Sequence, residues 1–170
     1  MKRVLISLLL IAFPISGNGA EEAVPNSAAT EGFRWSGFQD ALGKAMQSDK
    51  LIFVDVYTDW CGWCKKLDKD VYSRDDIRSY LDEKFVSVKL NAEDNSTSVT
   101  IAEQELTYAQ LASAYGVRSF PTTLFLLSDG KLLYALRGYH PPERFMKALR
   151  YFGEKTYVED LSLGQKQTGE

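Results

Sequence analysis

Helix-like and strand-like spacings of apolar residues follow one another along the chain. Near the start, five residues at helical spacing predict an amphipathic helix: Phe38, Ala41, Leu42, Ala45 and Met46. The next run, Leu51–Val56, is apolar apart from Asp55. Runs of this kind are typical of a parallel strand that is covered on both faces. The first two elements are therefore predicted to be a helix and a buried strand.

The central part of the chain predicts a helix from Cys61 to about Val71, a second helix around residues 77–81 and a strand that ends near Asn91. Residues 92–106 are polar and acidic, and we expect them to form a long loop with at most a short turn of structure. Loops of this length inside a compact domain are often functional. This segment could therefore contact a partner, although a solvated insertion explains it equally well.

The last third predicts a helix over residues 108–115, followed by a hairpin of two strands over 123–127 and 132–137. A final amphipathic helix begins at Pro141-Pro142. In order, these elements form a right-handed βαβ unit and then a ββα unit. They predict an α/β fold with a mixed central sheet of about four strands and helices on both faces.

Composition places the chain among globular proteins, with 170 residues, 45% hydrophobic residues and 25% charged residues. The length suits one domain, which we expect over residues 35–155, between a flexible linker over 21–34 and a C-terminal tail over 156–170. A formal net charge of −3 argues against nucleic acid as the main partner. Two cysteines cannot form a disulfide scaffold, so the core must come from hydrophobic burial.

Residues 1–20 have the pattern of a secretory signal peptide. Lys2 and Arg3 give a positive start, Val4–Phe13 is apolar, and small residues follow. The apolar run is shorter than the about 20 residues that a spanning helix needs, although an uncleaved anchor is the alternative. Removal of this segment would leave 18 basic and 23 acidic side chains, a formal charge of −5. We therefore expect an exported, periplasmic or otherwise extracytoplasmic protein.

The only two cysteines lie in the segment Trp60-Cys61-Gly62-Trp63-Cys64, between the predicted strand and helix. Free amide groups at a helix N-terminus stabilise a thiolate, so Cys61 is predicted to be the exposed attacking sulfur. Cys64 is one turn later and can resolve a mixed disulfide. A static disulfide and a zinc site are the alternatives. A zinc site would need two further ligands, and His140 is the only histidine.

Asp55 is the one charged residue inside the predicted central strand, six positions before Cys61. A buried carboxyl is costly unless it has a partner or a task, and burial raises its pKa. Asp55 is therefore predicted to accept a proton from Cys64, with Lys89 on the neighbouring strand as its partner. A purely structural ion pair is the alternative.

Several motifs, in the same order, resemble the thioredoxin superfamily over roughly residues 35–153. Val54–Lys65 resembles its active-site segment, Val88–Asn91 the segment with its buried lysine, and Tyr115–Thr122 the run into its cis-proline. Trp63 stands where the family usually has proline. A longer segment after Lys89 makes the chain similar to exported thioredoxin-like reductases, such as the periplasmic C-terminal domain of DsbD-type thiol transporters.

The resemblance implies a cis bond before Pro121, a Phe120 backbone that pairs with an extended substrate, and a glycine, Gly138, that lets substrate approach. We also expect Trp60 to pack on the domain and Trp63 to be exposed. The residues that the resemblance places around a substrate are Trp60, Gly62, Trp63, Phe120, Pro121 and Gly138.

The sequence thus predicts an exported thiol–disulfide oxidoreductase that reduces disulfides in partner proteins and needs no cofactor and no metal. Re-reduction by a membrane thiol transporter and a monomeric state are further expectations. An oxidase or isomerase with the same residues remains an alternative, as does a binding module in which the two cysteines are incidental. Reduction potentials near −270 mV are typical of a reductant and potentials near −120 mV of an oxidant.

Overall fold

The computed structural model describes residues 33–159. The predicted signal peptide lies outside these residues, as do most of the predicted linker and of the predicted tail. None of the helices in the described range has the length and apolarity to cross a bilayer.

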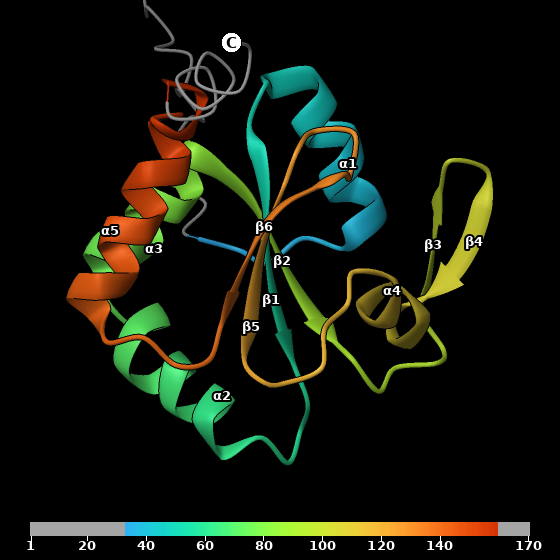
Figure 1. Ribbon diagram of the computed structural model, residues 1–170, viewed down its shortest axis with the longest axis horizontal. Helices are drawn as coiled ribbons and strands as arrows, with labels where there is room; N and C mark the ends of the chain where they lie inside the picture. The colour runs from blue at the N-terminus through green and yellow to red at the C-terminus, as the bar shows by residue number, and fades with distance from the viewer. Residues whose placement is uncertain (1–32, 160–170) are drawn as a thin grey trace, which may run out of the picture. The chain divides into compact units, whose positions relative to one another are not determined.

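A mixed four-stranded sheet forms the centre of the domain, as predicted (Figure 1). In spatial order its strands are β2 (Phe85–Asn91), β1 (Leu51–Tyr57), β5 (Thr122–Leu126) and β6 (Leu132–Arg137). β1 pairs in parallel with β2, whereas β5 is antiparallel to both β1 and β6. β1 is therefore an interior strand, and its end leads directly into the cysteine motif.

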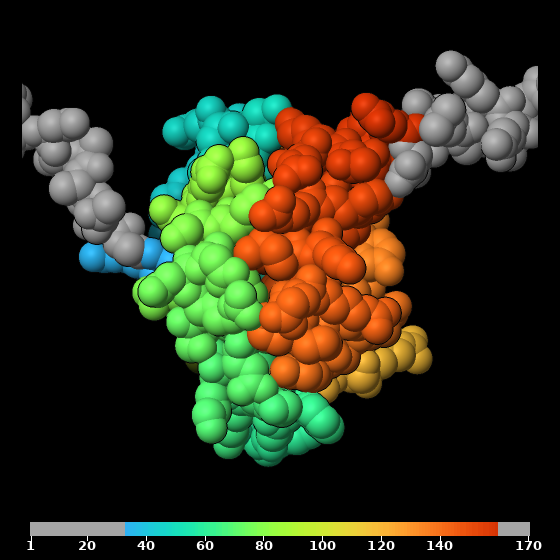
Figure 2. Space-filling model, turned by 90° about the vertical axis from the view of Figure 1, so that its left-hand side faces the viewer, coloured from blue at the N-terminus to red at the C-terminus, as the bar shows by residue number. Residues whose placement is uncertain are grey.

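Helices cover both faces of this sheet. One face carries α1 (Phe38–Ser48) and α4 (Tyr108–Ala114). The other face carries α3 (Asp75–Lys84) and α5 (Pro142–Gly153), which lie side by side in green and red-orange in Figure 2. α2 (Gly62–Leu67) continues into a π-helical turn, Asp68–Tyr72, before α3 begins. π-helical turns inside α-helices are frequent at functional sites.

β1 is buried on both faces because its side chains alternate between two hydrophobic clusters. Ile52, Val54 and Val56 pack toward α1 and α4. Phe53 packs on the opposite face, at the centre of a group of aromatic rings. Its partners in that group, at centroid distances from 5.8 to 6.2 Å, are Trp35, Tyr72, Phe85, Phe125 and Phe145. Aromatic pairs of this geometry stabilise the core beyond simple burial.

The predicted apolar face of the first helix is wrong at Met46, because 71% of the surface of this residue is exposed. The other four predicted positions are buried. Met46 lies eight residues after Phe38, and at 3.6 residues per turn this places it at the margin of the apolar stripe. The sheet therefore covers the centre of the stripe and leaves Met46 in solvent.

The predicted long loop over residues 92–106 is also wrong in part, because it contains a small β-hairpin. β3 (Ser98–Ile101) pairs with β4 (Gln104–Thr107). Ala102 and Glu103 form the turn between them, both with positive φ. Neither glycine nor asparagine marks this turn, so the usual sequence signal for a two-residue hairpin is missing. Val99 is buried and anchors the hairpin on the α1 side of the core.

Packed structure extends past the predicted domain boundary at residue 155. Tyr157 is buried, and its ring lies 5.9 Å from that of Phe152. Phe33, inside the predicted linker, likewise packs edge-on against Trp35 at 4.9 Å.

Candidate active site

The two cysteines lie where the chain passes from β1 into α2, at the lower end of the sheet in Figure 1. They form a disulfide, with Cα atoms 5.3 Å apart. Cys61 is the N-cap of α2, and the backbone N–H of Cys64 donates to its Sγ atom at 3.0 Å. Hydrogen bonds to a sulfur favour its charged form. The helix start therefore supports a thiolate at Cys61 when the disulfide opens.

Exposure around the disulfide differs from what the sequence predicts. Both cysteines are only 4% exposed, so Cys61 is not an exposed sulfur in this oxidised form. Trp60 is 67% exposed and Trp63 58%, so Trp63 is exposed as expected, whereas the domain does not cover Trp60 as expected. The Trp60 Nε1–H donates to Glu93 at 2.9 Å, which holds the indole at the surface. The disulfide is thus buried, whereas the neighbouring side chains of Trp60 and Trp63 are exposed.

Asp55 and Lys89 face one another across the parallel pair β1 and β2, as predicted. The Nζ atom of Lys89 lies 3.6 Å from Oδ2 of Asp55. Lys89 also contacts the carboxylate of Asp68, which sequence reasoning missed. Asp68 is four residues after Cys64, one helical turn along the same face, and this spacing was the available signal. The partly buried ammonium group of Lys89 therefore contacts two carboxylates, the buried one of Asp55 and the half-exposed one of Asp68.

Burial raises the pKa of Asp55 from 3.8 to about 6. Lys89 acts in the opposite direction, and the charge of Asp68 adds to the rise. Oδ1 of Asp55 is buried and has no hydrogen-bond partner among the described residues. An ionised carboxylate with an unpartnered buried oxygen is costly, which is why desolvation dominates. Asp55 can thus exchange a proton in the weakly acidic range.

Three aromatic rings surround the Lys89 ammonium group. They belong to Trp35, Tyr57 and Tyr72, with centroids 5.4, 5.2 and 5.8 Å from Nζ. Contacts of this kind stabilise a cation without neutralising it. Sequence reasoning missed Trp35 and Tyr72, because one precedes the first helix and the other ends the π-helical turn.

The proline side of the site lies against Trp60. The Phe120–Pro121 peptide bond is cis. The Phe120 ring meets the Trp60 ring edge-on at 5.9 Å. The N–H of Gly138, at a φ of 81°, donates to the Pro121 carbonyl at 2.8 Å. The structure thus brings Trp60, Phe120, Pro121 and Gly138 together around the start of α2, although their roles toward substrate stay predictions.

Trp63 contacts the segment that follows Gly138. Its ring lies 5.5 Å from that of Tyr139, whose hydroxyl donates to Asp70 at 3.0 Å. Gly62 starts α2, and a Cβ atom added there would meet nothing within 4 Å. His140 lies with Nε2 at 3.1 Å from the carbonyl oxygen of Arg137, so it caps a loop next to the site.

Comparison with known proteins agrees with this geometry. The family model of the thioredoxin-like domain matches residues 38–153. The DsbD thiol:disulfide interchange protein of Yersinia pestis is 28% identical over 154 residues, which are 86% of this chain and 24% of that protein. Protein disulfide isomerase-like 5-2 of Oryza sativa is 30% identical over 99 residues, 58% of this chain and 19% of that protein. The chain therefore spans about a quarter or less of these curated relatives.

Among solved structures, a candidate disulphide isomerase from Bacteroides thetaiotaomicron superposes with a TM-score of 0.56 at 34% identity, over 70% of this chain and 89% of that one. The oxidised C-terminal domain of DsbD from Neisseria meningitidis superposes with a TM-score of 0.53 at 19% identity, over 66% of this chain and 90% of that one, and supports the fold. Together with the Cys61–Cys64 pair, these matches show that the chain belongs to the thioredoxin-like family of disulfide oxidoreductases and isomerases.

Proposed function

We propose that this chain is an exported thiol–disulfide oxidoreductase that reduces disulfides in partner proteins. The observation that carries the proposal is the arrangement at the start of α2. Cys61 Sγ accepts a backbone hydrogen bond, and a buried carboxyl with a raised pKa lies on the strand that leads to it. This combination supplies an attacking thiolate and a proton acceptor at one site.

The reaction begins when the Cys61 thiolate attacks one sulfur of a substrate disulfide. That disulfide breaks, a mixed disulfide forms with Cys61, and the other substrate sulfur leaves as a thiolate. Asp55 then accepts the proton of Cys64, whose sulfur attacks Cys61 Sγ. The substrate is released with both sulfurs reduced, two electrons have passed to it, and the Cys61–Cys64 disulfide of the present structure remains.

A further cycle requires an external dithiol that reduces the Cys61–Cys64 disulfide. We assign this task to a membrane thiol transporter, because an exported dithiol becomes oxidised without a reducing partner. The resemblance to a DsbD domain supports the assignment. Residues 1–20 support export. N-terminal sequencing of the secreted or periplasmic protein should give a start close to Glu21, and an intact Met1 would argue against cleavage.

Trapping with Cys64→Ser tests the order of the sulfurs. The variant keeps the attacking thiol and lacks the resolving one, so it should accumulate a covalent complex with a disulfide-containing protein that dithiothreitol releases. Cys61→Ser is the matched control and should trap little. Equal trapping by both variants would contradict the assigned roles. Full cellular function of Cys61→Ser would favour a binding module instead.

Isomerisation is the second candidate, because one relative carries the name of a disulfide isomerase. It needs attack by Cys61 and release by the substrate's own thiol, with no net electron transfer. The reduction potential separates the candidates, since a reductant of thioredoxin type lies near −270 mV and protein disulfide isomerase near −180 mV. A measured value at or above −180 mV would overturn the reductase proposal.

A further inference from the structure

β6 is an edge strand of the central sheet, and its outer side is open. In the strand order β2-β1-β5-β6 it pairs only with β5, and no other strand of the described chain lies beyond it. The outward N–H and C=O groups of such a strand can hydrogen-bond to another chain. Natural proteins normally protect such edges, so an edge that is left uncovered is a candidate binding surface.

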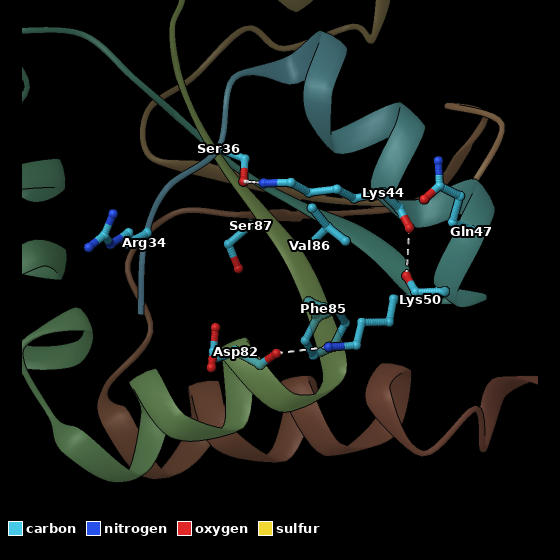
Figure 3. Close-up of a pocket in the computed structure, with 10 residues that line it drawn as sticks. Arg34, Ser36, Lys44, Gln47, Lys50, Asp82, Phe85, Val86 and Ser87 are labelled. Atoms are coloured by element: carbon cyan, nitrogen blue, oxygen red, sulfur yellow. Dashed lines mark hydrogen bonds between the residues drawn. The ribbon is translucent and has the colours of Figure 1, made fainter. Parts of the chain in front are cut away.

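The other edge, formed by β2, is protected. Ser36 bridges to Val88, and its N–H donates to the carbonyl of Ser87 at 2.8 Å. Two lysines lie over the rest of that edge (Figure 3). Lys44 Nζ donates to Ser36 Oγ at 3.3 Å, and Lys50 Nζ donates to the Asp82 carbonyl at 2.9 Å. Lysines and a covering segment are devices that prevent edge-to-edge pairing.

β6 has no comparable protection in the described structure. Its first five residues, Leu132–Leu136, are all apolar or aromatic and carry no charge. Leu132 is 43% exposed and Tyr134 49%. The one irregularity in its pairing with β5 lies beside Leu126, so the register is regular from Tyr134 to Arg137. An exposed, uncharged edge strand is an aggregation hazard unless something covers it.

An apolar groove of about 610 Å³ runs beside this edge, between β6 and α5. The residues that line it include Tyr134, Leu136, Lys147, Ala148, Tyr151 and Phe152. The rings of Tyr134 and Phe152, which both line the groove, lie 5.3 Å apart. Pockets for alternate side chains beside a free strand edge are what strand addition requires.

Lys147 lines the α5 side of the groove, and Arg144 precedes it by about one helical turn. Arg144 and Lys147 are three residues apart on one face of α5 and are exposed. Neither forms an ion pair with another described residue. Several other cations of the described chain pair with carboxylates, namely Lys66, Arg74, Lys131 and Lys155. Two unpaired cations beside an apolar groove complement a ligand with carboxylates next to apolar side chains.

We propose that the outer edge of β6 binds an extended segment of a partner protein, which adds to the sheet as a further strand. Apolar side chains of that segment fill the groove, and acidic side chains meet Arg144 and Lys147. β6 ends at Arg137, and the next residue, Gly138, hydrogen-bonds to Pro121, so a bound partner would extend toward the segment that carries the cis-proline. The surface itself requires no cysteine, and it could therefore exist even if the proposed redox role were wrong.

A blocked, fluorescein-labelled ten-residue peptide of alternating valine and glutamate is a suitable probe. Fluorescence anisotropy should show saturable binding to the full chain, and a probe with lysine in place of glutamate should bind much more weakly. The double variant Arg144→Glu/Lys147→Glu should weaken binding about tenfold, because two attractive surface pairs become repulsive. Lys44→Glu/Lys50→Glu, with the same charge change at the β2 edge, is the matched control and should bind as the parent does.

Hydrogen exchange locates the probe on the chain. Strand addition should slow exchange of the outward amides of residues 132–137, and N-methylation of alternate probe residues should abolish binding. Equal binding by the charge-reversed variant, or protection confined to the segment around Trp60 and Trp63, would overturn the proposal. Binding that appears only after removal of residues 160–170 would assign the groove to the chain's own C-terminal segment and overturn it as well.

Discussion

Asp55 is the residue at which the proposed chemistry and the stability of the fold oppose one another. Its carboxyl is buried in the central strand, and burial raises its pKa to about 6. Lys89 compensates only in part, because the same ammonium group also contacts Asp68. A group that destabilises the fold when charged and lies on the strand before a redox pair is a strong candidate for a functional residue.

Asp55→Asn should slow resolution of the mixed disulfide while leaving the first attack by Cys61 nearly unchanged. Asparagine cannot accept the proton of Cys64, and general base catalysis contributes typically about 10²–10⁴-fold. The parent rate should rise with pH around 6, where Asp55 ionises, and this rise should vanish in the variant. Stopped-flow mixing with a disulfide substrate measures both steps. An unchanged rate of resolution and pH profile would leave Asp55 with a structural role only.

The same substitution should stabilise the oxidised protein at neutral pH. The carboxyl ionises near pH 4 in the unfolded chain but near 6 in the folded one, so the folded state holds an extra proton between these values. The free energy of unfolding therefore falls as pH rises from about 4 to 6 and stays lower above that. Asp55→Asn should remove this loss. The free energy of unfolding of the variant should therefore exceed that of the parent by about 1–3 kcal/mol at pH 8, and by almost nothing at pH 3.

Urea denaturation at several pH values measures this effect, and Asp94 provides a control of opposite sign. Hydrogen bonds from Ser96 and Thr97 hold the pKa of Asp94 well below its usual range. Its contribution to stability is therefore present above the unfolded pKa and lost as pH falls. Asp94→Asn should accordingly lose stability at pH 8. A gain for Asp55→Asn that is equal at pH 3 and pH 8 would show that ionisation is not its cause.

At the scale of the elements, the packing of α5 against α3 depends on a glycine. A Cβ atom at Gly153 would lie 3.0 Å from the Tyr80 hydroxyl and 3.2 Å from Cβ of Lys84. Gly43, in the middle of α1, offers a comparison without such a contact, since a Cβ there would meet nothing within 4 Å. Alanine substitutions at the two glycines therefore distinguish the effect of helix propensity on stability from the effect of the contact between α3 and α5.

Gly43→Ala should stabilise the protein by about 0.5–1 kcal/mol, because alanine is the better helix former. Gly153→Ala should destabilise it by about 1 kcal/mol, because overpacking costs more than propensity gains. Thermal denaturation of both variants measures the difference. If Gly153→Ala stabilised the protein as much as Gly43→Ala, the contact between α3 and α5 would have to be loose enough to accept a methyl group.

The main elements could be predicted because their signals are local. The apolar run of β1, the alternation in β2 and the prolines before α5 each specify an element without tertiary information. The β3–β4 hairpin could not, because Ala102 and Glu103 adopt positive φ without the residues that normally signal it. Met46 was misplaced because helical spacing identifies a stripe but not how much of it the sheet covers.

At the scale of the whole molecule, the candidate site is assembled from distant segments, and this limited what the sequence could predict. The motif around Cys61 and Cys64 and the pairing of Asp55 with Lys89 follow from neighbouring strands. Trp35 joins the site because its neighbour Ser36 bridges to Val88, the residue before Lys89 on β2. The contact of Asp68 with Lys89 depends on the path of the π-helical turn. The spacing of Asp68 from Cys64 indicates a shared helix face, but no local pattern specifies that Trp35 and Asp68 meet Lys89.

The direction of electron flow is likewise a property of the whole fold, because it depends on which redox state is more stable. A strong oxidant of the DsbA type owes its high potential to a stabilised reduced form. A reductant should show the opposite, and we therefore expect the oxidised chain to unfold at a higher temperature than the chain with both thiols reduced. Every 30 mV in potential corresponds to about 1.4 kcal/mol of this difference.

Differential scanning calorimetry of the two redox states tests the expectation, with excess dithiol present for the reduced sample. The double variant Cys61→Ser/Cys64→Ser is the matched control, because it cannot form the disulfide and should unfold close to the reduced protein. A reduced form that is more stable than the oxidised one would indicate an oxidant. It would overturn the proposed reductase direction while leaving the roles of Cys61 and Cys64 intact, since oxidation and reduction pass through the same mixed disulfide.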